Sequence, residues 1–281
     1  MAPQQRTSIL CPHCRMLVSV QALRCLHCGM ARPGAWWKNT ALTRGLHNAV
    51  TLVRMLLAVN IGMYVLSLLL APMSSDASFN PLTLLSPGTQ SLLLLGATGT
   101  IPIDGLQRWW TLVSANYLHG GILHLAFNMM ALRQLGPFVA EEYGVSRLIS
   151  LYTLTGIIGF GVSYLAGIRF TIGASAAICG LIGATLYYGK SRGGAYGRTI
   201  YRQVGSWAIA IFVFGLVVPR INNWGHGGGM AAGVLLGFLL GYQEQRRESL
   251  LHTLLANACL VLTALILAWA IFSGTLYKFS G

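Results

Sequence analysis

Seven apolar stretches follow one another along this chain, and they constrain its fold more than any other feature. They lie near residues 52–71, 113–135, 148–167, 173–189, 204–219, 225–241 and 252–274. A helix needs about 20 apolar residues to cross a hydrocarbon layer of roughly 30 Å. Of the 281 residues, 54% are hydrophobic and 9% are charged, whereas soluble domains have about 25% charged residues. The sequence therefore predicts an all-α, polytopic membrane protein with seven helices, two of them short.

The basic residues predict the orientation of these helices. The first apolar stretch begins about fifty residues into the chain and no small-residue cleavage site follows it, so we expect a retained anchor rather than a cleaved signal peptide. With the N-terminus in the cytoplasm, 15 of the 19 Lys and Arg residues fall inside, and the four outside are Arg108, Arg169, Arg220 and Lys278. This bias satisfies the positive-inside rule. We expect a multi-pass protein with a cytoplasmic N-terminus, in the inner (plasma) membrane of a bacterium.

The formal net charge of +13 follows from the same distribution. The excess lies in the cytoplasmic loops and the N-terminal segment, where it assists insertion and contacts anionic lipid. Nucleic-acid binding needs a basic surface interleaved with aromatic residues, and the main body of the sequence has no such pattern. We expect the lipid bilayer as a partner and no nucleic acid.

Two C-x-x-C pairs precede the first apolar stretch, Cys11-Pro12-His13-Cys14 and Cys25-Leu26-His27-Cys28. Each pair presents two thiolates from one tight turn, and two pairs complete a tetrahedral shell around Zn²⁺. Disulfides or redox-active pairs are the alternative, but the cytoplasm keeps thiols reduced and no thioredoxin-like βαβ pattern is present. The ligands are expected to be Cys11, Cys14, Cys25 and Cys28, in preference to sets that recruit His13 or His27.

These cysteines define a predicted zinc-ribbon-like module over residues 1–32. About thirty residues cannot bury a sizeable core, so structural Zn²⁺ would supply most of the folding free energy. A linker over 33–50 follows, with Trp36 and Trp37 as an interfacial anchor. The remaining cysteines, Cys179 and Cys259, lie in apolar helices and are expected to act as small hydrophobic residues.

Polar groups stand near the outer start of those predicted helices that run from outside to inside. Ser175 begins the fourth helix and His226 begins the sixth, so both lie at similar depth and can touch. Such groups are costly in a bilayer and suggest chemistry, with Ser175 as nucleophile and His226 as general base. In the second helix, His124 and Asn128 share one face. Their N–H groups are the donors that stabilise an oxyanion.

Other interpretations of these residues remain open at this point. A membrane serine near glycine can be a packing residue, and a lone membrane histidine can be a satisfied interior group. His119, His124 and His226 could instead bind a metal, because three histidines can hold catalytic zinc. A transporter or channel predicts charged residues near the bilayer midplane or an inverted repeat, and neither is found.

Three separated motifs resemble those of the rhomboid intramembrane serine proteases. They are His119-x₄-His124-x₃-Asn128, Gly173-Ala174-Ser175 and His226-x₂-Gly229-x₃-Gly233, and the resemblance covers about residues 50–245. It implies a six-helix core over 51–245 that opens to water from the outer side. Residues 246–281 would add a further transmembrane helix and tail, as in six-plus-one members of the family.

The resemblance also implies roles for individual residues. Ser175 and His226 would form a catalytic dyad without an acidic third member. His124 and Asn128, with the backbone N–H of Ser175, would form the oxyanion site. His119 would have a structural or water-retaining role, and Gly173 and Gly229 would be structural positions near the site. Residues 72–112, with Trp109 and Trp110, resemble the membrane-dipping first loop of rhomboids.

Two residues depart from the family pattern. Ala176 follows the predicted nucleophile where the family usually has glycine, so a methyl group is added beside a crowded dyad. Arg108 precedes the Trp109-Trp110 pair and Thr111 follows it, where the family usually has arginine after the pair.

The predicted function is a serine-type endopeptidase that hydrolyses peptide bonds in or near transmembrane segments of other proteins. No cofactor is expected for catalysis, and the expected substrates are membrane proteins with helix-destabilising segments. The alternative, which Ala176 suggests, is an inactive rhomboid-like protein that binds client transmembrane segments without cutting them.

Overall fold

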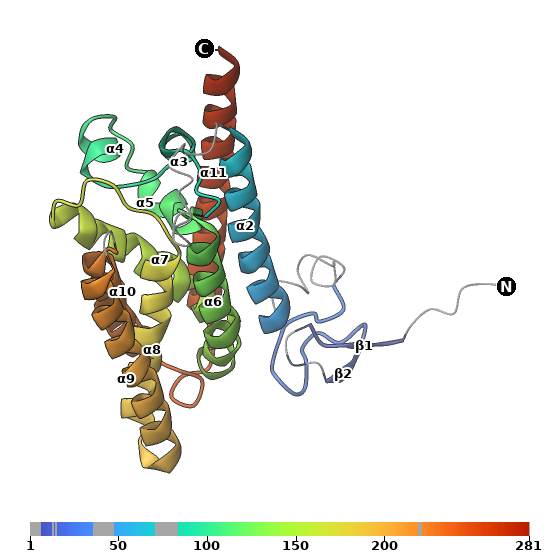
Figure 1. The fold of residues 1–281 in the computed structure, drawn as a ribbon. Coiled ribbons are helices and arrows are strands. Elements are labelled where there is room, and N and C mark those ends of the chain that lie inside the picture. Colours follow the sequence, from blue (N-terminus) through green and yellow to red (C-terminus); the bar gives the residue numbers. More distant parts are fainter. Residues whose placement is uncertain are drawn as a thin grey trace. The chain divides into compact units, whose positions relative to one another are not determined.

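Helices account for most of the chain, as the apolar stretches predict. The computed structural model describes residues 7–12, 14, 16–35, 48–70, 84–218 and 221–280 (Figure 1). The chain forms two compact units, Met1–Leu52 and Val53–Gly281, which are considered separately. His13 and both tryptophans of the predicted interfacial anchor, Trp36 and Trp37, lie outside the described residues.

The N-terminal unit is built on a short antiparallel hairpin. Strand β1 (Ser8–Leu10) pairs with β2 (Leu17–Ser19), with Ile9 opposite Val18. Each C-x-x-C pair lies in a tight turn closed by backbone hydrogen bonds, from Cys11 N to Met16 O (2.9 Å) and from Cys25 N to Met30 O (2.8 Å). Cys11, Val18 and Cys25 form the small buried core of this unit. The cysteines are therefore the structural centre of the hairpin.

Seven long helices are described in the rest of the chain. They are α2 (Ala49–Leu70), α6 (Ile122–Tyr143), α7 (Val145–Leu165), α8 (Ser175–Arg192), α9 (Gly194–Val217), α10 (Asn223–Leu240) and α11 (Leu250–Ser280). By length and apolar composition alone, α2, α7, α9 and α11 could each cross a membrane. Glycines and polar residues lower the hydropathy of α6, α8 and α10, and these three carry the predicted site residues.

The boundaries differ from the sequence prediction at two helices, because α9 begins ten residues before the predicted stretch 204–219 and the second helix also differs. The apolar stretch 113–135 is not one helix, because α6 begins only at Ile122 and continues to Tyr143. The preceding residues form the short helices α5 (Thr111–Ser114) and η3 (Ala115–Tyr117). Two further short helices, α3 (Thr89–Leu94) and α4 (Thr100–Asp104), lie in the described part of the predicted first loop. Gly120 and Gly121, poor helix formers, separate η3 from α6.

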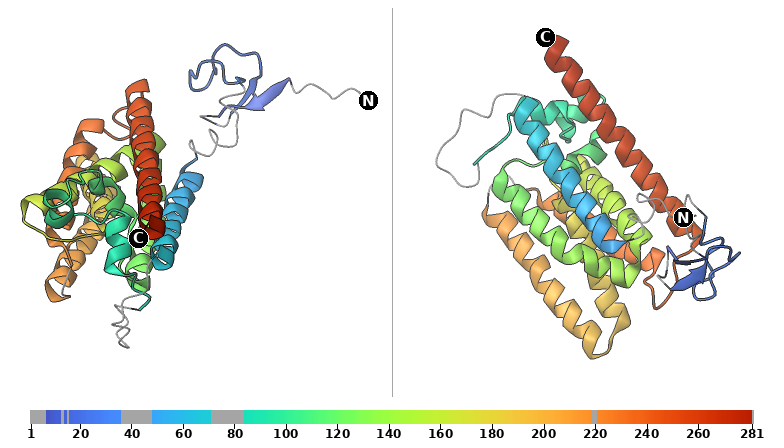
Figure 2. Two further views of the ribbon diagram at one scale, coloured as in Figure 1. Left: turned by 90° about the horizontal axis from the view of Figure 1, so that it is seen from above. Right: turned by 90° about the vertical axis from the view of Figure 1, so that its right-hand side faces the viewer.

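Helices α7, α8 and α10 pack closely on one another (Figures 1 and 2). Helix α8 lies parallel to α10 because glycines on α10 face its backbone in steps of four residues. A Cβ at Gly229 would overlap the carbonyl oxygen of Ala176, and one at Gly233 would overlap that of Gly180. These glycines therefore form the surface on which the two helices meet.

The loop between α10 and α11 is attached to the start of α7. Glu248 Oε1 accepts hydrogen bonds from the backbone N–H groups of Ser146 (2.8 Å) and Arg147 (3.3 Å). The Arg147 guanidinium is fully buried and donates to the carbonyl oxygens of Tyr143 (2.7 Å) and Arg246 (2.6 Å). Helix α11 then packs against α7. The predicted additional C-terminal helix is therefore joined to the core by buried polar contacts.

Candidate active site

Ser175 is the first residue of α8, and the chain before it is held in place on both sides. Thr171 pairs with Thr98 in a short β-bridge, and Gly173 N donates to Ala115 O at 2.9 Å. Gly173 has φ +125°, a conformation that favours glycine, and a Cβ there would lie 2.7 Å from His124 Nε2. Glycine is therefore required at position 173 for backbone and spatial reasons together.

The structure brings Ser175 and His226 together, as the helix order predicts. Ser175 Oγ lies 2.9 Å from His226 Nε2, within hydrogen-bonding distance. His226 is in the first turn of α10 and is 8% exposed, whereas Ser175 is partly exposed. His226 Nδ1 is buried without a hydrogen-bond partner among the described residues. The arrangement is thus a pair of side chains and not a Ser–His–carboxylate triad.

His124 presents a hydrogen-bond donor to the same space. Its Nδ1 accepts the backbone N–H of Gly120 at 3.3 Å, which assigns the proton of a neutral imidazole to Nε2. The position that a Cβ would occupy at Gly173 lies 2.7 Å from this Nε2 and 3.6 Å from Ser175 Oγ. His124 Nε2–H therefore faces the region next to the serine hydroxyl.

Asn128 and His119 lie around His124. Asn128 is buried one turn further along α6, and its Nδ2 donates to His124 O at 2.8 Å. The ring of His119 is fully buried and packs edge-on against the ring of His124, with centroids 5.1 Å apart. In the described part of the chain, these histidines do not bring their ligand atoms together around a common point with His226. The geometry therefore gives no support to the alternative of a histidine metal site.

Asn222 was not among the predicted site residues, yet it joins the segments that carry the pair. It is the N-cap of α10, and its Oδ1 accepts Gly225 N at 3.0 Å. Its Nδ2 donates to Ser163 Oγ (2.7 Å) on α7 and to Thr171 Oγ1 (3.0 Å) before α8. An asparagine directly before an apolar helix is a common N-cap signal and could have indicated the first contact. The other two contacts depend on the tertiary fold.

The methyl group of Ala176 points into the helix packing. Ala176 is 1% exposed and clusters with Ala115 and Phe160. Its Cβ lies 3.0 Å from the position that a Cβ would occupy at Gly159 on α7. The absence of a side chain at Gly159 therefore provides the space that the extra methyl group needs.

The departures in the loop before α6 also have partners. Arg108 Nη1 donates to Leu93 O at 3.2 Å, and Thr111 Oγ1 donates to Arg108 O at 2.6 Å. Trp109 packs edge-on against Tyr164, with centroids 5.3 Å apart. Arg108 and Thr111 thus hold the described part of this loop together, while residues 71–83 lie outside the described chain.

The four predicted zinc ligands converge in the N-terminal unit. The Sγ atoms of Cys11, Cys14, Cys25 and Cys28 all lie within 4.8 Å of one another. Cys11 Sγ is 3.7 Å from Cys28 Sγ, and Cys14 Sγ is 3.6 Å from Cys25 Sγ. Four thiolates around a tetrahedral zinc ion lie about 3.8 Å apart, given Zn–S bonds of about 2.3 Å. The residues therefore fit a Cys₄ zinc site.

The thiols of this cluster differ in how readily they ionise, because burial raises the pKa of Cys14 and raises that of Cys28 to about 12, whereas the pKa of Cys25 is lowered. Burial opposes ionisation of Cys25, but hydrogen bonds from the backbone N–H groups of Cys28 and His27 and from neighbouring thiols lower its pKa to about 6. The His27 side chain is exposed and is not one of the converging ligands. Cys179 and Cys259 are buried free cysteines, in α8 and α11.

Comparison with known proteins relates the membrane unit to one family. The family model of the rhomboid domain matches residues 106–243. RHOMBOID-like protein 5 of Arabidopsis thaliana is 37% identical over 177 residues, which cover 60% of this chain and 56% of that protein. Rhomboid protease GluP of Bacillus subtilis (strain 168) is 36% identical over 156 residues, covering 56% of this chain and 31% of that protein.

RHOMBOID-like protein 4 of Arabidopsis thaliana is 34% identical over 166 residues, covering 57% of this chain and 41% of that protein. The chain thus spans about half or less of the length of these relatives. The matched region contains α6, α7, α8, α9 and α10, and with them the Ser175–His226 pair. Residues 106–243 of this integral membrane protein therefore match the rhomboid domain, and the chain is similar to rhomboid proteins over that region.

Proposed function

We propose that the chain is an intramembrane serine endopeptidase that cuts peptide bonds in or near transmembrane segments of other membrane proteins. The observation that carries this proposal is the distance of 2.9 Å between Ser175 Oγ and His226 Nε2. A serine needs an adjacent base to become a nucleophile, and an imidazole nitrogen at this distance can accept its proton. The name of one relative, rhomboid protease GluP, agrees with such an activity.

In this mechanism His226 Nε2 accepts the proton while Ser175 Oγ attacks the substrate carbonyl. The carbonyl oxygen becomes an oxyanion, for which His124 Nε2–H and the backbone N–H of Ser175 are donors, with Asn128 one turn away. His226 then gives the proton to the leaving amine, and an acyl-enzyme on Ser175 remains. Water that enters from the outer side releases the acyl group. No cofactor takes part in these steps.

The substrate must expose a peptide carbonyl to Ser175. Backbone groups of a membrane helix are already hydrogen-bonded within the helix, so a segment must unwind before it can be attacked. We expect substrates that have small or helix-breaking residues near the outer boundary of the membrane. His119, Gly173 and Gly229 support the site without direct chemistry, His119 against the His124 ring and the glycines by allowing close backbone approach.

The proposal is tested with a fluorophosphonate probe and with a membrane proteome. Ser175→Ala and His226→Ala should abolish probe labelling and should lower cleavage by about 10³-fold or more. New protein termini, identified by mass spectrometry, should appear with the parent and not with Ser175→Ala. Ser67→Ala is a matched control, because Ser67 is buried in α2 and donates only within its helix, to Tyr64 O.

Cleavage by Ser175→Ala at the parental rate would disprove the assignment. Retained binding of membrane segments without any new termini from the parent would favour the non-cutting alternative. That alternative derives from Ala176, and the packing of its methyl group against α7 gives no reason for inactivity.

We also propose that Cys11, Cys14, Cys25 and Cys28 hold one structural Zn²⁺, and that the N-terminal unit lies in the cytoplasm. Zinc would supply folding free energy to this unit and take no part in hydrolysis. The convergence of the four sulfur atoms supports the ligand set. The positive-inside distribution supports the side of the membrane.

A further inference from the structure

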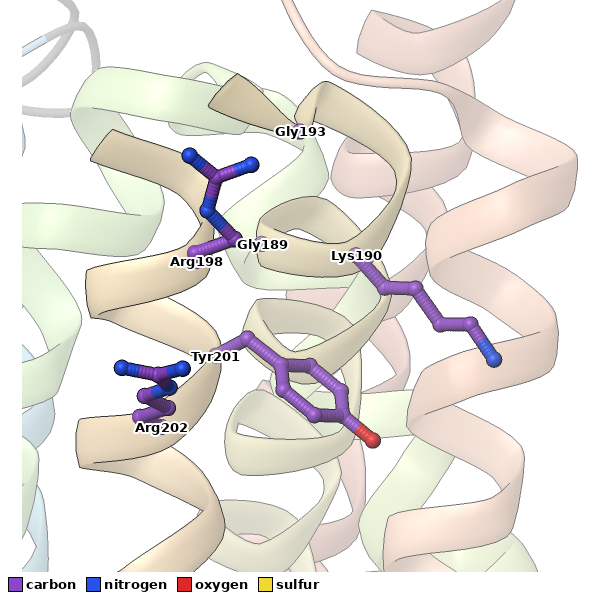
Figure 3. Close-up of a pocket in the computed structure, with 6 residues that line it drawn as sticks. All are labelled: Gly189, Lys190, Gly193, Arg198, Tyr201 and Arg202. Carbon is purple, nitrogen blue, oxygen red and sulfur yellow. The ribbon is translucent and has the colours of Figure 1, made fainter. Parts of the chain in front are cut away.

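The hairpin between α8 and α9 forms a shallow hollow far from the Ser–His pair. Helix α8 ends at Arg192 and α9 begins at Gly194, so only Gly193 separates them. Their backbones touch, since a Cβ at Gly197 would lie 2.6 Å from Gly189 O. The hollow has a volume of about 300 Å³ and is lined by Gly189, Lys190, Gly193, Arg198, Tyr201 and Arg202 (Figure 3). This volume is at the lower end of small-molecule sites, ~300–1,000 Å³.

Three of these lining residues are cationic, and no carboxylate neutralises them within the described chain. Arg198 and Arg202 stand one turn apart on α9, and Lys190 extends from α8 (Figure 3). The ion pair at this hairpin involves Arg192, which does not line the hollow. Arg192 Nε lies 3.0 Å from Glu244 Oε2. Glu142 is also engaged, accepting a hydrogen bond from Tyr196 at 3.0 Å. Lys190, Arg198 and Arg202 therefore leave a local excess of positive charge.

The donors around the hollow are of the types that bind a phosphate group, with Arg198 and Arg202 on one side of Tyr201 and Lys190 on the other (Figure 3). Guanidinium groups donate paired N–H groups to phosphate oxygens, and an ammonium group adds a mobile charge. The Tyr201 hydroxyl is a further donor at the same rim. The carbonyl end of α8 and the amide end of α9 meet here, and their opposite partial charges offset one another. Binding therefore depends on the side chains and not on a helix dipole.

The position of the hollow favours a lipid over a free anion. Helix α8 has 18 residues, and at about 1.5 Å per residue its far end lies about 27 Å from Ser175, close to the thickness of a hydrocarbon layer. Further along α9, Ile209 is 67% exposed and Leu216 is 80% exposed, which is expected of a face covered by lipid. Tyr196 and Tyr201, which are 46% and 43% exposed, suit the headgroup region. We therefore expect lipid headgroups at the level of the hairpin.

We propose that this hollow binds the phosphodiester headgroup of an anionic phospholipid, with Lys190, Arg198 and Arg202 as the charged contacts. The acyl chains of the lipid would run along the exposed apolar face of α9. Basic pockets at the ends of membrane helices recognise anionic headgroups in this manner. The site is distinct from the Ser175–His226 pair and does not depend on the proposed hydrolysis.

The test is a native mass-spectrometry titration of the full-length protein with phosphatidylglycerol and, separately, with phosphatidylcholine. Lys190→Gln/Arg198→Gln/Arg202→Gln should weaken phosphatidylglycerol binding at least tenfold and leave the weaker phosphatidylcholine binding unchanged. Arg198→Lys/Arg202→Lys retains the charge but not the paired N–H donors of guanidinium. Its affinity for phosphatidylglycerol should therefore lie between that of the parent and that of the triple Gln variant. Inorganic phosphate at millimolar concentration should not displace the lipid.

A matched control removes the same charge elsewhere. Arg133→Gln/Arg246→Gln/Arg247→Gln changes three exposed residues that do not line the hollow, and it should retain phosphatidylglycerol affinity within twofold. Thermal unfolding of all variants verifies folding. Equal losses in the two triple variants would show that net charge alone attracts the lipid. Equal losses would overturn the proposal. It would also be overturned if Lys190→Gln/Arg198→Gln/Arg202→Gln bound phosphatidylglycerol with parental affinity, or if inorganic phosphate displaced the lipid.

Discussion

At the scale of single residues, hydrogen bonds outside the Ser–His pair determine where its two members lie. Asn222 caps α10 through Gly225 N and contacts Ser163 and Thr171. Since Thr171 lies four residues before Ser175, one side chain links the starts of α8 and α10. The side chain of Ala176, in contrast, packs against α7. These two residues allow separate tests of positioning and packing.

The two functions of Asn222 can be separated by substitution. Asn222→Ser retains an N-cap oxygen but cannot reach both hydroxyl groups, whereas Asn222→Ala loses the cap as well. Both variants should lower kcat, and Asn222→Ala should also lose about 1 kcal/mol of stability. Single-turnover kinetics and thermal unfolding measure the two effects. Parental kcat in Asn222→Ala would show that Asn222 does not position the pair.

The packing of Ala176 predicts the effect of restoring the glycine usual in the family. Ala176→Gly removes a buried methyl group and adds backbone freedom, so it should lower stability by about 1 kcal/mol. Cleavage should stay within threefold of the parent, because the methyl group faces Gly159 and not the serine hydroxyl. An increase of tenfold or more would mean that Ala176 obstructs the reaction.

At the scale of helices, close backbone contact between α8 and α10 places the pair. The glycines of α10 face α8 at positions 229 and 233, three and seven residues after His226. Without side chains between them, the helix backbones approach closely. The backbone of α7 also comes close at Gly159, because a Cβ at that residue would lie 2.7 Å from Gly225 O. A change at one of these glycines should therefore be transmitted to Ser175 and His226.

Two glycines of α10 provide a matched comparison. Gly233→Ala should separate α8 from α10, because its Cβ would overlap Gly180 O, and should reduce probe labelling of Ser175 at least tenfold. Gly227→Ala gains the same helix propensity, and its Cβ would meet only Phe212, at 3.5 Å. The probe should therefore label Ser175 in Gly227→Ala as strongly as in the parent. Similar labelling of the two variants would contradict the role of the α8–α10 contact.

At the scale of the whole molecule, the chain combines two compact units with different sources of stability. Around the hairpin of the N-terminal unit, the described residues form a small buried core of Cys11, Val18 and Cys25, so we expect its folding to depend on metal. The second unit is a helical membrane domain in which polar contacts hold the C-terminal part. Glu248 accepts a hydrogen bond at the start of α7, and Lys278 Nζ donates to Leu69 O at 2.8 Å. The Ser175–His226 pair lies wholly in the second unit.

Loss of the metal should therefore affect one unit only. Elemental analysis of the full-length protein should find about one Zn²⁺ per chain, and Cys11→Ser should remove it. Cys259→Ser, which changes a buried cysteine of α11, should retain it. Probe labelling of Ser175 should be unaffected in Cys11→Ser. A metal content of Cys11→Ser equal to that of the parent would exclude Cys11 as a ligand.

Much of this organisation could be predicted from the sequence because it depends on local patterns. Apolar length predicts the membrane helices, and the order of the helices predicts that Ser175 and His226 share one end of the bundle. The C-x-x-C spacing predicts the converging sulfur atoms. The predicted start of the second helix was wrong because the apolar stretch continues through α5 and η3. Average hydropathy does not reveal that Gly120 and Gly121 interrupt the helix. The roles of the site residues remain predictions until the variants are measured.

The sequence by itself determined the membrane class, the helix order, the cysteine cluster and the identities of the paired serine and histidine. Each of these depends on the type and spacing of residues along the chain. Only the tertiary structure decided that Asn222 joins three segments, that the methyl group of Ala176 fits beside Gly159, and that Lys190, Arg198 and Arg202 surround one hollow. These features arise between residues far apart in the chain, because side-chain distances are set by the packing of helix backbones and not by local periodicity.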